Sequence, residues 1–204
     1  MTNRIVDPTA HGDAVASSTE QALLGEGARW DGRRGELLVV DILAGRVYRG
    51  RVADDGGLSP VRAYQVPGTV GAIAPVQGDE GWLLAAGLGF VHLSPDGSLR
   101  TLAEVAPAGT RMNDAACDPQ GRFWAGTLAD DHRPGGGALY RLERDGRTEL
   151  MLDGLTISNG LRPGLAGFAK SLADELGPRG IRVIGLLPSR IDTDRVRELD
   201  GLSP

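Results

Sequence analysis

Three oxygen-bearing side chains stand in short motifs that are widely separated along the chain. Glu26 lies in Leu-Gly-Glu-Gly-Ala-Arg-Trp, Asn113 in Arg-Met-Asn-Asp and Asn159 in Ile-Ser-Asn-Gly-Leu. Carboxylate and amide oxygens are the ligands that Ca²⁺, Mg²⁺ and Mn²⁺ prefer, and Zn²⁺ accepts them less selectively. If the fold brings the three side chains together, they form a site for a divalent metal ion.

Each of these residues also has an ordinary structural interpretation. A lone Glu26 is typical of a solvated turn, and Asn159 followed by Gly160 is first of all a signal for a type I′ turn. Asn113 followed by Asp114 can hydrogen-bond its own backbone as an Asx turn. Only their joint occurrence favours a functional site, so the elements that carry them decide the interpretation.

One pattern recurs three times: a short apolar strand, a second strand, an Asp-Gly turn and a third strand. The matching first strands begin at residues 37, 82 and 123, which gives spacings of 45 and 41 residues. These spacings suit a propeller blade of four antiparallel strands, in which Asp-Gly supplies the positive φ of a hairpin turn. A β-sandwich is the alternative, although its turn signals recur at shorter intervals.

Each copy is preceded by a short segment that could form the innermost strand of its blade. These segments run from 27 to 30, from 71 to 76 and from 112 to 117. In a propeller the inner strands line the central channel, and we expect Glu26, Asn113 and Asn159 to lie along it. We also expect Trp30, Trp82 and Trp124 to lie in the core.

The pattern changes after residue 162. Apolar residues then recur at the spacing of an amphipathic helix: Leu165, Phe168, Ala169, Leu172, Ala173 and Leu176. Residues 181–187 follow as a short apolar strand of the buried, parallel kind. The fold class expected is therefore mainly β, a partial propeller over residues 20–162, with a lead segment over 1–19 and a helix-strand α/β fragment over 163–204.

The composition excludes several classes of partner. A net charge of -5 with dispersed Lys and Arg provides no surface for nucleic acid. Cys117 is the single cysteine, so no intramolecular disulfide or Cys-x-x-Cys site can form, and His11, His92 and His132 show no metal spacing. No apolar stretch approaches a signal peptide or a membrane span, and we expect a cytoplasmic location.

Four segments together resemble the gluconolactonase, regucalcin and senescence marker protein family over about residues 20–161. They are Gly25-Glu26-Gly27 with Trp30, Arg111-Met112-Asn113-Asp114, residues 118–127 (Asp-Pro-Gln-Gly-Arg-Phe-Trp-Ala-Gly-Thr) and Ile157-Ser158-Asn159-Gly160. The resemblance implies a six-bladed propeller that hydrolyses sugar lactones with a central divalent metal. It makes Glu26 and Asn159 metal ligands, and Arg111 and Asn113 substrate-contacting residues. The metal implied is calcium or zinc, with magnesium or manganese as alternatives.

The sequence departs from this family in one respect that bears on activity. The family's site also uses an aspartate, which binds the metal and acts as the general base, and which follows the Ser-Asn-Gly-Leu motif. No residue of this chain can be assigned that role, so no catalytic residue is predicted. We expect weak metal binding and little or no hydrolysis, since affinity for a hard cation rises with the number of charged ligands.

The last residues resemble a different family, the short-chain dehydrogenase/reductases, over about residues 163–204. The catalytic tyrosine and lysine of that family would fall at Ser158 and Arg162, and the chain has no Gly-rich dinucleotide turn. No NAD(P)-binding residues are therefore predicted, and an oxidoreductase is the weakest hypothesis. An inactive fusion product, or a metal-binding or assembling module, remains the main alternative to a lactonase.

Three blades cannot close a six-bladed ring. The outer faces of the first and last blades then lack the neighbours that would bury their apolar side chains. We expect self-association through these open faces, unless the helix predicted after residue 163 covers one of them.

Overall fold

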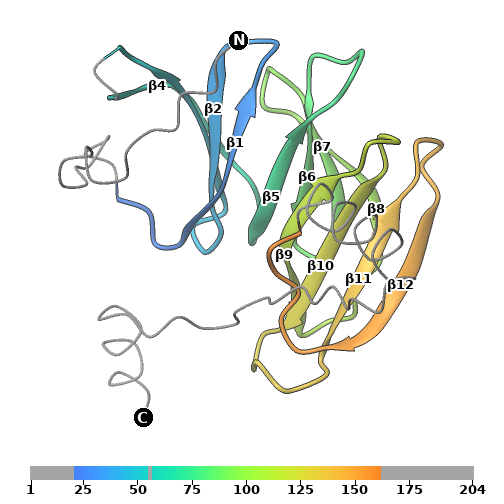
Figure 1. The fold of residues 1–204 in the computed structure, drawn as a ribbon. Coiled ribbons are helices and arrows are strands. Elements are labelled where there is room, and N and C mark those ends of the chain that lie inside the picture. The colour runs from blue at the N-terminus through green and yellow to red at the C-terminus, as the bar shows by residue number, and fades with distance from the viewer. Residues whose placement is uncertain (1–20, 55–56, 162–204) are drawn as a thin grey trace, which may run out of the picture.

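The computed structural model describes residues 21–54 and 57–161, and these form three four-stranded antiparallel sheets (Figure 1). The first sheet contains β1 (Gly25–Asp31), β2 (Glu36–Asp41), β3 (Arg46–Val52) and β4 (Leu58–Gln65). The second contains β5 (Val70–Pro75), β6 (Trp82–Ala86), β7 (Gly89–Leu93) and β8 (Leu99–Glu104). The third contains β9 (Thr110–Cys117), β10 (Phe123–Ala129), β11 (Gly137–Leu142) and β12 (Thr148–Leu155).

The sheets are consecutive blades of a partial propeller, as the repeat predicts. In each sheet the strands lie side by side in chain order, and the first strands β1, β5 and β9 are neighbours at the inner edge (Figure 1). The predicted first strands at 37, 82 and 123 fall within β2, β6 and β10. The predicted inner segments 27–30 and 112–117 fall within β1 and β9, and segment 71–76 matches β5 except for residue 76, so the sandwich alternative is wrong for the described residues.

The predicted helix-strand fragment over 163–204 and the lead segment over 1–19 lie outside the described residues. Across residues 21–54 and 57–161, no helix has the length and apolarity needed to cross a membrane.

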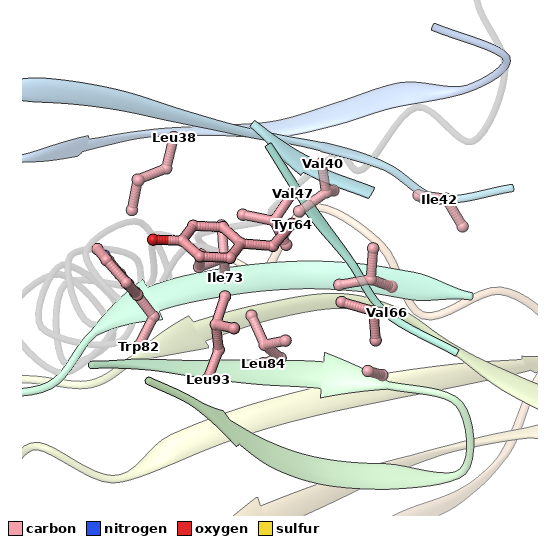
Figure 2. Packing of buried hydrophobic residues seen from close by; sticks show 12 residues of the cluster. Leu38, Val40, Ile42, Val47, Tyr64, Val66, Ile73, Trp82, Leu84 and Leu93 are labelled. Carbon is pink, nitrogen blue, oxygen red and sulfur yellow. The ribbon is translucent and has the colours of Figure 1, made fainter. Parts of the chain in front are cut away.

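A first apolar cluster fills the boundary between the first two blades (Figure 2). Leu38 and Val40 of β2 face Trp82 and Leu84 of β6, and all four side chains are fully buried. The ring of Tyr64 packs at 5.8 Å from the ring of Trp82. Removal of this much apolar surface from water is the main force that fixes one blade against the next.

A second cluster fills the boundary between the second and third blades. Phe90 of β7 and Phe123 of β10 meet edge to face with their ring centroids 6.0 Å apart. Alanines occupy the narrow inner part of this boundary, where Ala72 and Ala74 of β5 are buried with the same cluster. Small side chains allow the inner strands to approach closely, which is needed where blades converge on the axis.

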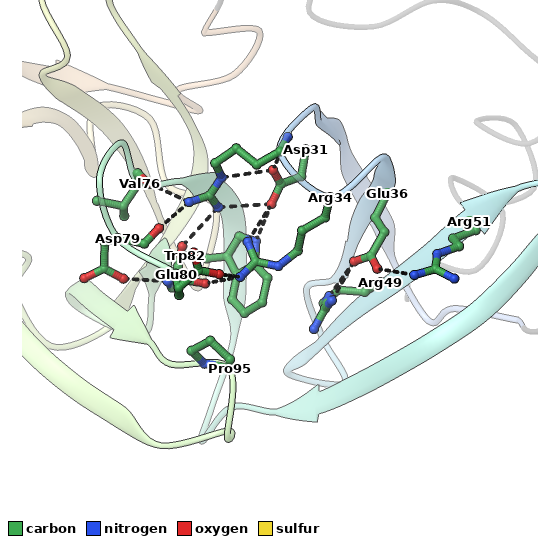
Figure 3. Close-up of polar contacts among 12 residues, drawn as sticks. Asp31, Arg34, Glu36, Arg49, Arg51, Val76, Asp79, Glu80, Trp82 and Pro95 are labelled. Carbon is green, nitrogen blue, oxygen red and sulfur yellow. Dashed lines mark hydrogen bonds and ion pairs between the residues drawn. The ribbon is translucent and has the colours of Figure 1, made fainter.

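A buried carboxylate at the end of β1 links the first two blades (Figure 3). The side chain of Asp31 is fully buried and accepts a hydrogen bond of 3.0 Å from Nε1 of Trp82. It also accepts one of 3.1 Å from Nε of Arg33. Nearby, Arg49 pairs with Glu36 at 2.7 Å and lies over the Trp82 ring.

The three tryptophans differ in burial. Trp82 is fully buried, as expected for a core residue, and Trp124 is half-buried on the outer face of the third blade. Trp30 is 55% exposed, so its assignment to the core was wrong. Its position on β1 pairs with Leu37, on the face of the first blade that points away from the second. Trp30 has no neighbouring blade to bury it among the described residues.

Candidate metal and substrate site

An open cavity of about 590 Å³ lies where the three inner strands converge. Residues of β1, β5 and β9 line it, together with residues 159–161. Glu26, Asn113 and Asn159 are all among the lining residues. The structure therefore brings three of the four predicted site residues to one cavity, although they are far apart in sequence.

Glu26 projects from an irregular part of β1. The pairing of β1 with β2 shifts register between Glu26 and Arg29, and the intervening Gly27 has a φ of 63°, which favours glycine. This bulge exposes the Glu26 side chain at the cavity. Within the described part of the chain its carboxylate has no ion pair or side-chain hydrogen bond, so both oxygens are available to a ligand.

Asn113 on β9 is held by two hydrogen bonds. Its Oδ1 accepts a bond of 2.9 Å from Nη1 of Arg111, and its Nδ2 donates one of 3.0 Å to the carbonyl oxygen of Ser158. Gly71 of β5 lies against the same stretch, since a Cβ there would come within 2.5 Å of the Asn113 carbonyl oxygen. Both polar atoms of the Asn113 side chain are therefore held, and the main chain of Asn113 lies against β5.

Arg111 is half-buried and does not itself line the cavity. Burial lowers the pKa of its guanidinium, while the negative charge of Asp130 opposes that shift. The guanidinium nevertheless stays charged at neutral pH, because the ordinary pKa of arginine lies so high. Arg111 contacts the site through its hydrogen bond to the Asn113 side chain.

The segment that carries Asn159 follows the third blade and returns to its inner edge. Ile157 forms a β-bridge with Leu128 of β10, and the side chain of Ser158 is buried against Gly126, where a larger residue would collide with it. The Asn159 side chain itself is exposed, and its Oδ1 accepts a hydrogen bond of 2.8 Å from the main-chain nitrogen of Gly160. The segment is anchored on both sides of its functional residue.

Asp114 also lines the cavity, although the sequence analysis assigned it no role in the site. Its Oδ2 accepts a hydrogen bond of 2.7 Å from the main-chain nitrogen of Leu161, and its Oδ1 accepts one from the main-chain nitrogen of Ala115. Asp114 thus ties β9 to the segment after Asn159. Its adjacency to Asn113 was the only available signal, and the contact that matters spans 47 residues.

The donor set fits a hard cation. Two carboxylates, of Glu26 and Asp114, and two amides, of Asn113 and Asn159, line the same cavity. Such oxygens suit calcium or magnesium, whereas no three His, Cys, Asp or Glu side chains gather anywhere in residues 21–54 and 57–161. Arg29 also lines the cavity and offsets part of its negative charge, which weakens attraction for a cation.

Comparison with known proteins identifies the class. Residues 24–163 match the model of the family described as SMP-30/gluconolactonase/LRE-like region. The chain therefore belongs to this family, which confirms the first of the two resemblances seen in the sequence. The match ends at residue 163, and the short-chain reductase interpretation of residues 163–204 stays a prediction.

Several curated relatives are about one-third identical to the chain over the aligned residues. A 6-deoxy-6-sulfogluconolactonase of Pseudomonas putida is 34% identical over 145 residues, which cover 70% of this chain and 48% of the relative. A regucalcin of Xenopus laevis is 34% identical over 157 residues, covering 73% and 50%. A pentonolactonase of Haloferax volcanii is 33% identical over 138 residues, covering 68% and 45%. The chain thus spans about half the length of these relatives.

The chain also matches about half the length of two solved structures. A calcium-binding regucalcin of Agrobacterium tumefaciens superposes with a TM-score of 0.62 at 25% identity, covering 69% of this chain and 47% of that one. A luciferin-regenerating enzyme gives a TM-score of 0.61 at 26% identity, covering 68% and 48%.

Proposed function

We propose that residues 20–161 form part of a metal-dependent sugar-lactone hydrolase. The observation that carries this proposal is the convergence of Glu26, Asn113 and Asn159 on one open cavity. Two kinds of relatives support it: those named as lactonases and the one described as calcium-binding. The substrate proposed is a small sugar lactone, and the metal is calcium or zinc, with magnesium or manganese as alternatives.

Glu26 and Asn159 are the proposed metal-holding residues. The Glu26 carboxylate is exposed in the cavity and unpaired within the described part of the chain, which leaves it free to take a cation. Asn159 presents an exposed amide on an anchored segment. When bound, a divalent cation would polarise the lactone carbonyl.

Asn113 and Arg111 are the proposed substrate-orienting residues. The Asn113 amide faces the cavity with its oxygen held by Arg111 and its nitrogen held by the Ser158 carbonyl. A group fixed in this way presents one defined surface to a substrate, which lowers the entropy lost on binding. The role of Arg111 is then to hold Asn113, since Arg111 does not line the cavity.

We expect turnover by this chain to be slow. The resemblance implies a further aspartate as metal ligand and general base, and no residue here is assigned to it. We do not assign Asp114 to this role, because its carboxylate ties β9 to the segment after Asn159 by accepting main-chain hydrogen bonds from Ala115 and Leu161. A metal-binding module without turnover is therefore the second candidate function.

Hydrolysis of gluconolactone in a pH-stat, after chelation and then with a metal series, tests the proposal. We expect a small metal-dependent rate above the spontaneous one, lost in Glu26→Gln and kept in Glu104→Gln, whose carboxylate lies on β8 outside the cavity. Metal binding with no rate would favour the second candidate. A rate that is insensitive to Glu26→Gln would contradict the proposed site.

A further inference from the structure

Among the described residues that line the cavity, Arg29 is the one with a cationic side chain. It lies on β1, three residues after Glu26, and it is half-buried. Its Nη2 donates a hydrogen bond of 3.3 Å to the carbonyl oxygen of Ala115 on β9. The side chain therefore extends from the first blade to the third, across the space where the inner strands converge.

The bulge in β1 turns the Arg29 side chain towards the cavity. Residues three apart on a regular strand lie on opposite faces of the sheet. Here Glu26 pairs with Val40 and Arg29 pairs with Leu38, and these two partners are only two residues apart on β2. The extra residue of the bulge therefore places the side chains of Glu26 and Arg29 on the same face of the blade.

The charges of Arg29 and Glu26 do not neutralise each other, although both side chains line the same cavity. Across residues 21–54 and 57–161, neither of them forms an ion pair. The bond to Ala115 uses one N–H group of the guanidinium and leaves the others for a ligand. Arg29 is thus a partly desolvated cation with unused donors, which binds an anionic group more strongly than an exposed arginine does.

The other charges of the lining indicate what charge a ligand should carry. Glu26 and Asp114 are the two carboxylates of the cavity, and Asp114 accepts hydrogen bonds from the main-chain nitrogens of Ala115 and Leu161. A divalent cation held by Glu26 would leave the lining with one positive charge in excess. A ligand with one anionic group would balance this charge.

We propose that Arg29 binds an anionic group of the substrate, so that the cavity favours an acidic sugar lactone over a neutral one. This inference rests on the proposed lactonase function and specifies its substrate class. The anionic group is a carboxylate, a sulfonate or a phosphate, because each of these accepts two parallel hydrogen bonds from a guanidinium. The neighbouring lining residues Gly71, Ala72 and Ala115 are small, which leaves room for such a group.

Two lactones that differ only at C6 test the proposal. D-Glucaro-1,4-lactone carries a carboxylate at C6, and D-glucono-1,4-lactone carries a hydroxymethyl group there. Isothermal titration calorimetry of the full chain in calcium gives a dissociation constant for each lactone. We expect the wild type to bind the acidic lactone about tenfold more tightly than the neutral one. Added NaCl should reduce this preference, because salt screens the ion pair.

Variants of Arg29 distinguish recognition of the anion from a structural role. Arg29→Gln should lose most of the preference and bind the neutral lactone within about twofold of the wild type. Arg29→Lys keeps the charge without the planar fork and should keep part of the preference. Arg100→Gln is the matched control, since Arg100 is exposed on β8 outside the cavity. A purely structural role, through the bond to Ala115, would weaken the binding of both lactones alike.

A metal-free measurement separates this inference from the proposed metal site. In chelator, we expect Glu26→Gln to prefer the acidic lactone, because the substitution removes a negative charge from the lining. The preference should disappear when Arg29→Gln is added to this variant. If calcium has no effect on the wild type and the preference still depends on Arg29, the metal site is refuted and the acidic-lactone inference stands.

Three results would overturn the inference. The first is equal affinity of the wild type for the two lactones, or no binding of the acidic one. The second is a preference that Arg29→Gln leaves unchanged, and if that variant does not fold, the same result in Arg29→Lys at low and high salt decides. The third is binding of inorganic phosphate as tight as that of the acidic lactone, which would make Arg29 a general anion site. Metal-dependent hydrolysis of the neutral lactone alongside any of these would leave the proposed function intact.

Discussion

Nδ2 of Asn113 donates a hydrogen bond of 3.0 Å to the carbonyl oxygen of Ser158, 45 residues further along the chain. This bond joins the inner strand of the third blade to the segment that carries Asn159. Asp114 adds a second link at Leu161. The two site segments are thus held in a fixed relation by neighbouring residues of one strand.

Replacement of Asn113 by aspartate should destabilise the protein by about 1–3 kcal/mol. The substitution exchanges a donor for an acceptor, so that a carboxylate oxygen faces the Ser158 carbonyl oxygen. Urea unfolding followed by circular dichroism measures the change. Asn159→Asp is the matched control, because that side chain is exposed and its oxygen accepts only from Gly160. Equal stability of the two variants would contradict the assigned bond.

Replacement of Gly71 by alanine tests the close approach of β5 to β9. The added Cβ would lie 2.5 Å from the Asn113 carbonyl oxygen and 2.8 Å from that of Met112, and these are backbone atoms that cannot swing aside. We expect a loss of about 1–3 kcal/mol. Gly32→Ala is the control, since its Cβ would meet nothing closer than 3.8 Å. If Gly71→Ala melts like the wild type, the two strands are further apart than described.

The strand positions could be predicted because their signals are local. Apolar runs such as the one that contains Leu38, and turns such as Asp96-Gly97, mark each blade without knowledge of its neighbours. Burial depends on those neighbours, which is why Trp82 was assigned correctly and Trp30 was not. Trp82 faces the first blade, whereas the face that holds Trp30 has no adjoining blade in the described residues.

The site could be predicted only in part for the same reason. Glu26, Asn113 and Asn159 stand in recognisable motifs, and the structure brings them to one cavity. Asp114 was missed because its contact with Leu161 is tertiary, and the placement of Arg111 behind Asn113 depends on side-chain geometry that the motif does not encode.

The buried carboxylate of Asp31 makes stability depend on pH. Burial raises the pKa of Asp31, but hydrogen bonds from Arg33 and Trp82 outweigh it, and the pKa in the folded protein lies below its ordinary value. A group with a lowered folded pKa stabilises the fold at pH values above its unfolded pKa of about 3.9, and this contribution is lost as pH falls through the folded pKa.

Asp31→Asn should therefore lower stability at neutral pH by about 1–3 kcal/mol and flatten its decline below about pH 5. Unfolding curves at a series of pH values measure both effects. Asp145→Asn serves for comparison, because Asp145 is exposed and pairs only with the nearby Arg147. If the stability of Asp31→Asn declines at low pH as steeply as that of the wild type, the acid sensitivity arises from other carboxylates.

If Glu26 holds a divalent cation in the cavity, the cation stabilises the folded protein, and a thermal melt with and without calcium measures this stabilisation. At a calcium concentration about ten times the dissociation constant, binding to the folded state should add about 1.4 kcal/mol of stability. We predict that the wild type and Glu104→Gln melt higher in calcium than in chelator, and that Glu26→Gln loses most of this increase. An equal increase in Glu26→Gln, or none in the wild type with calcium or with zinc, would contradict the account.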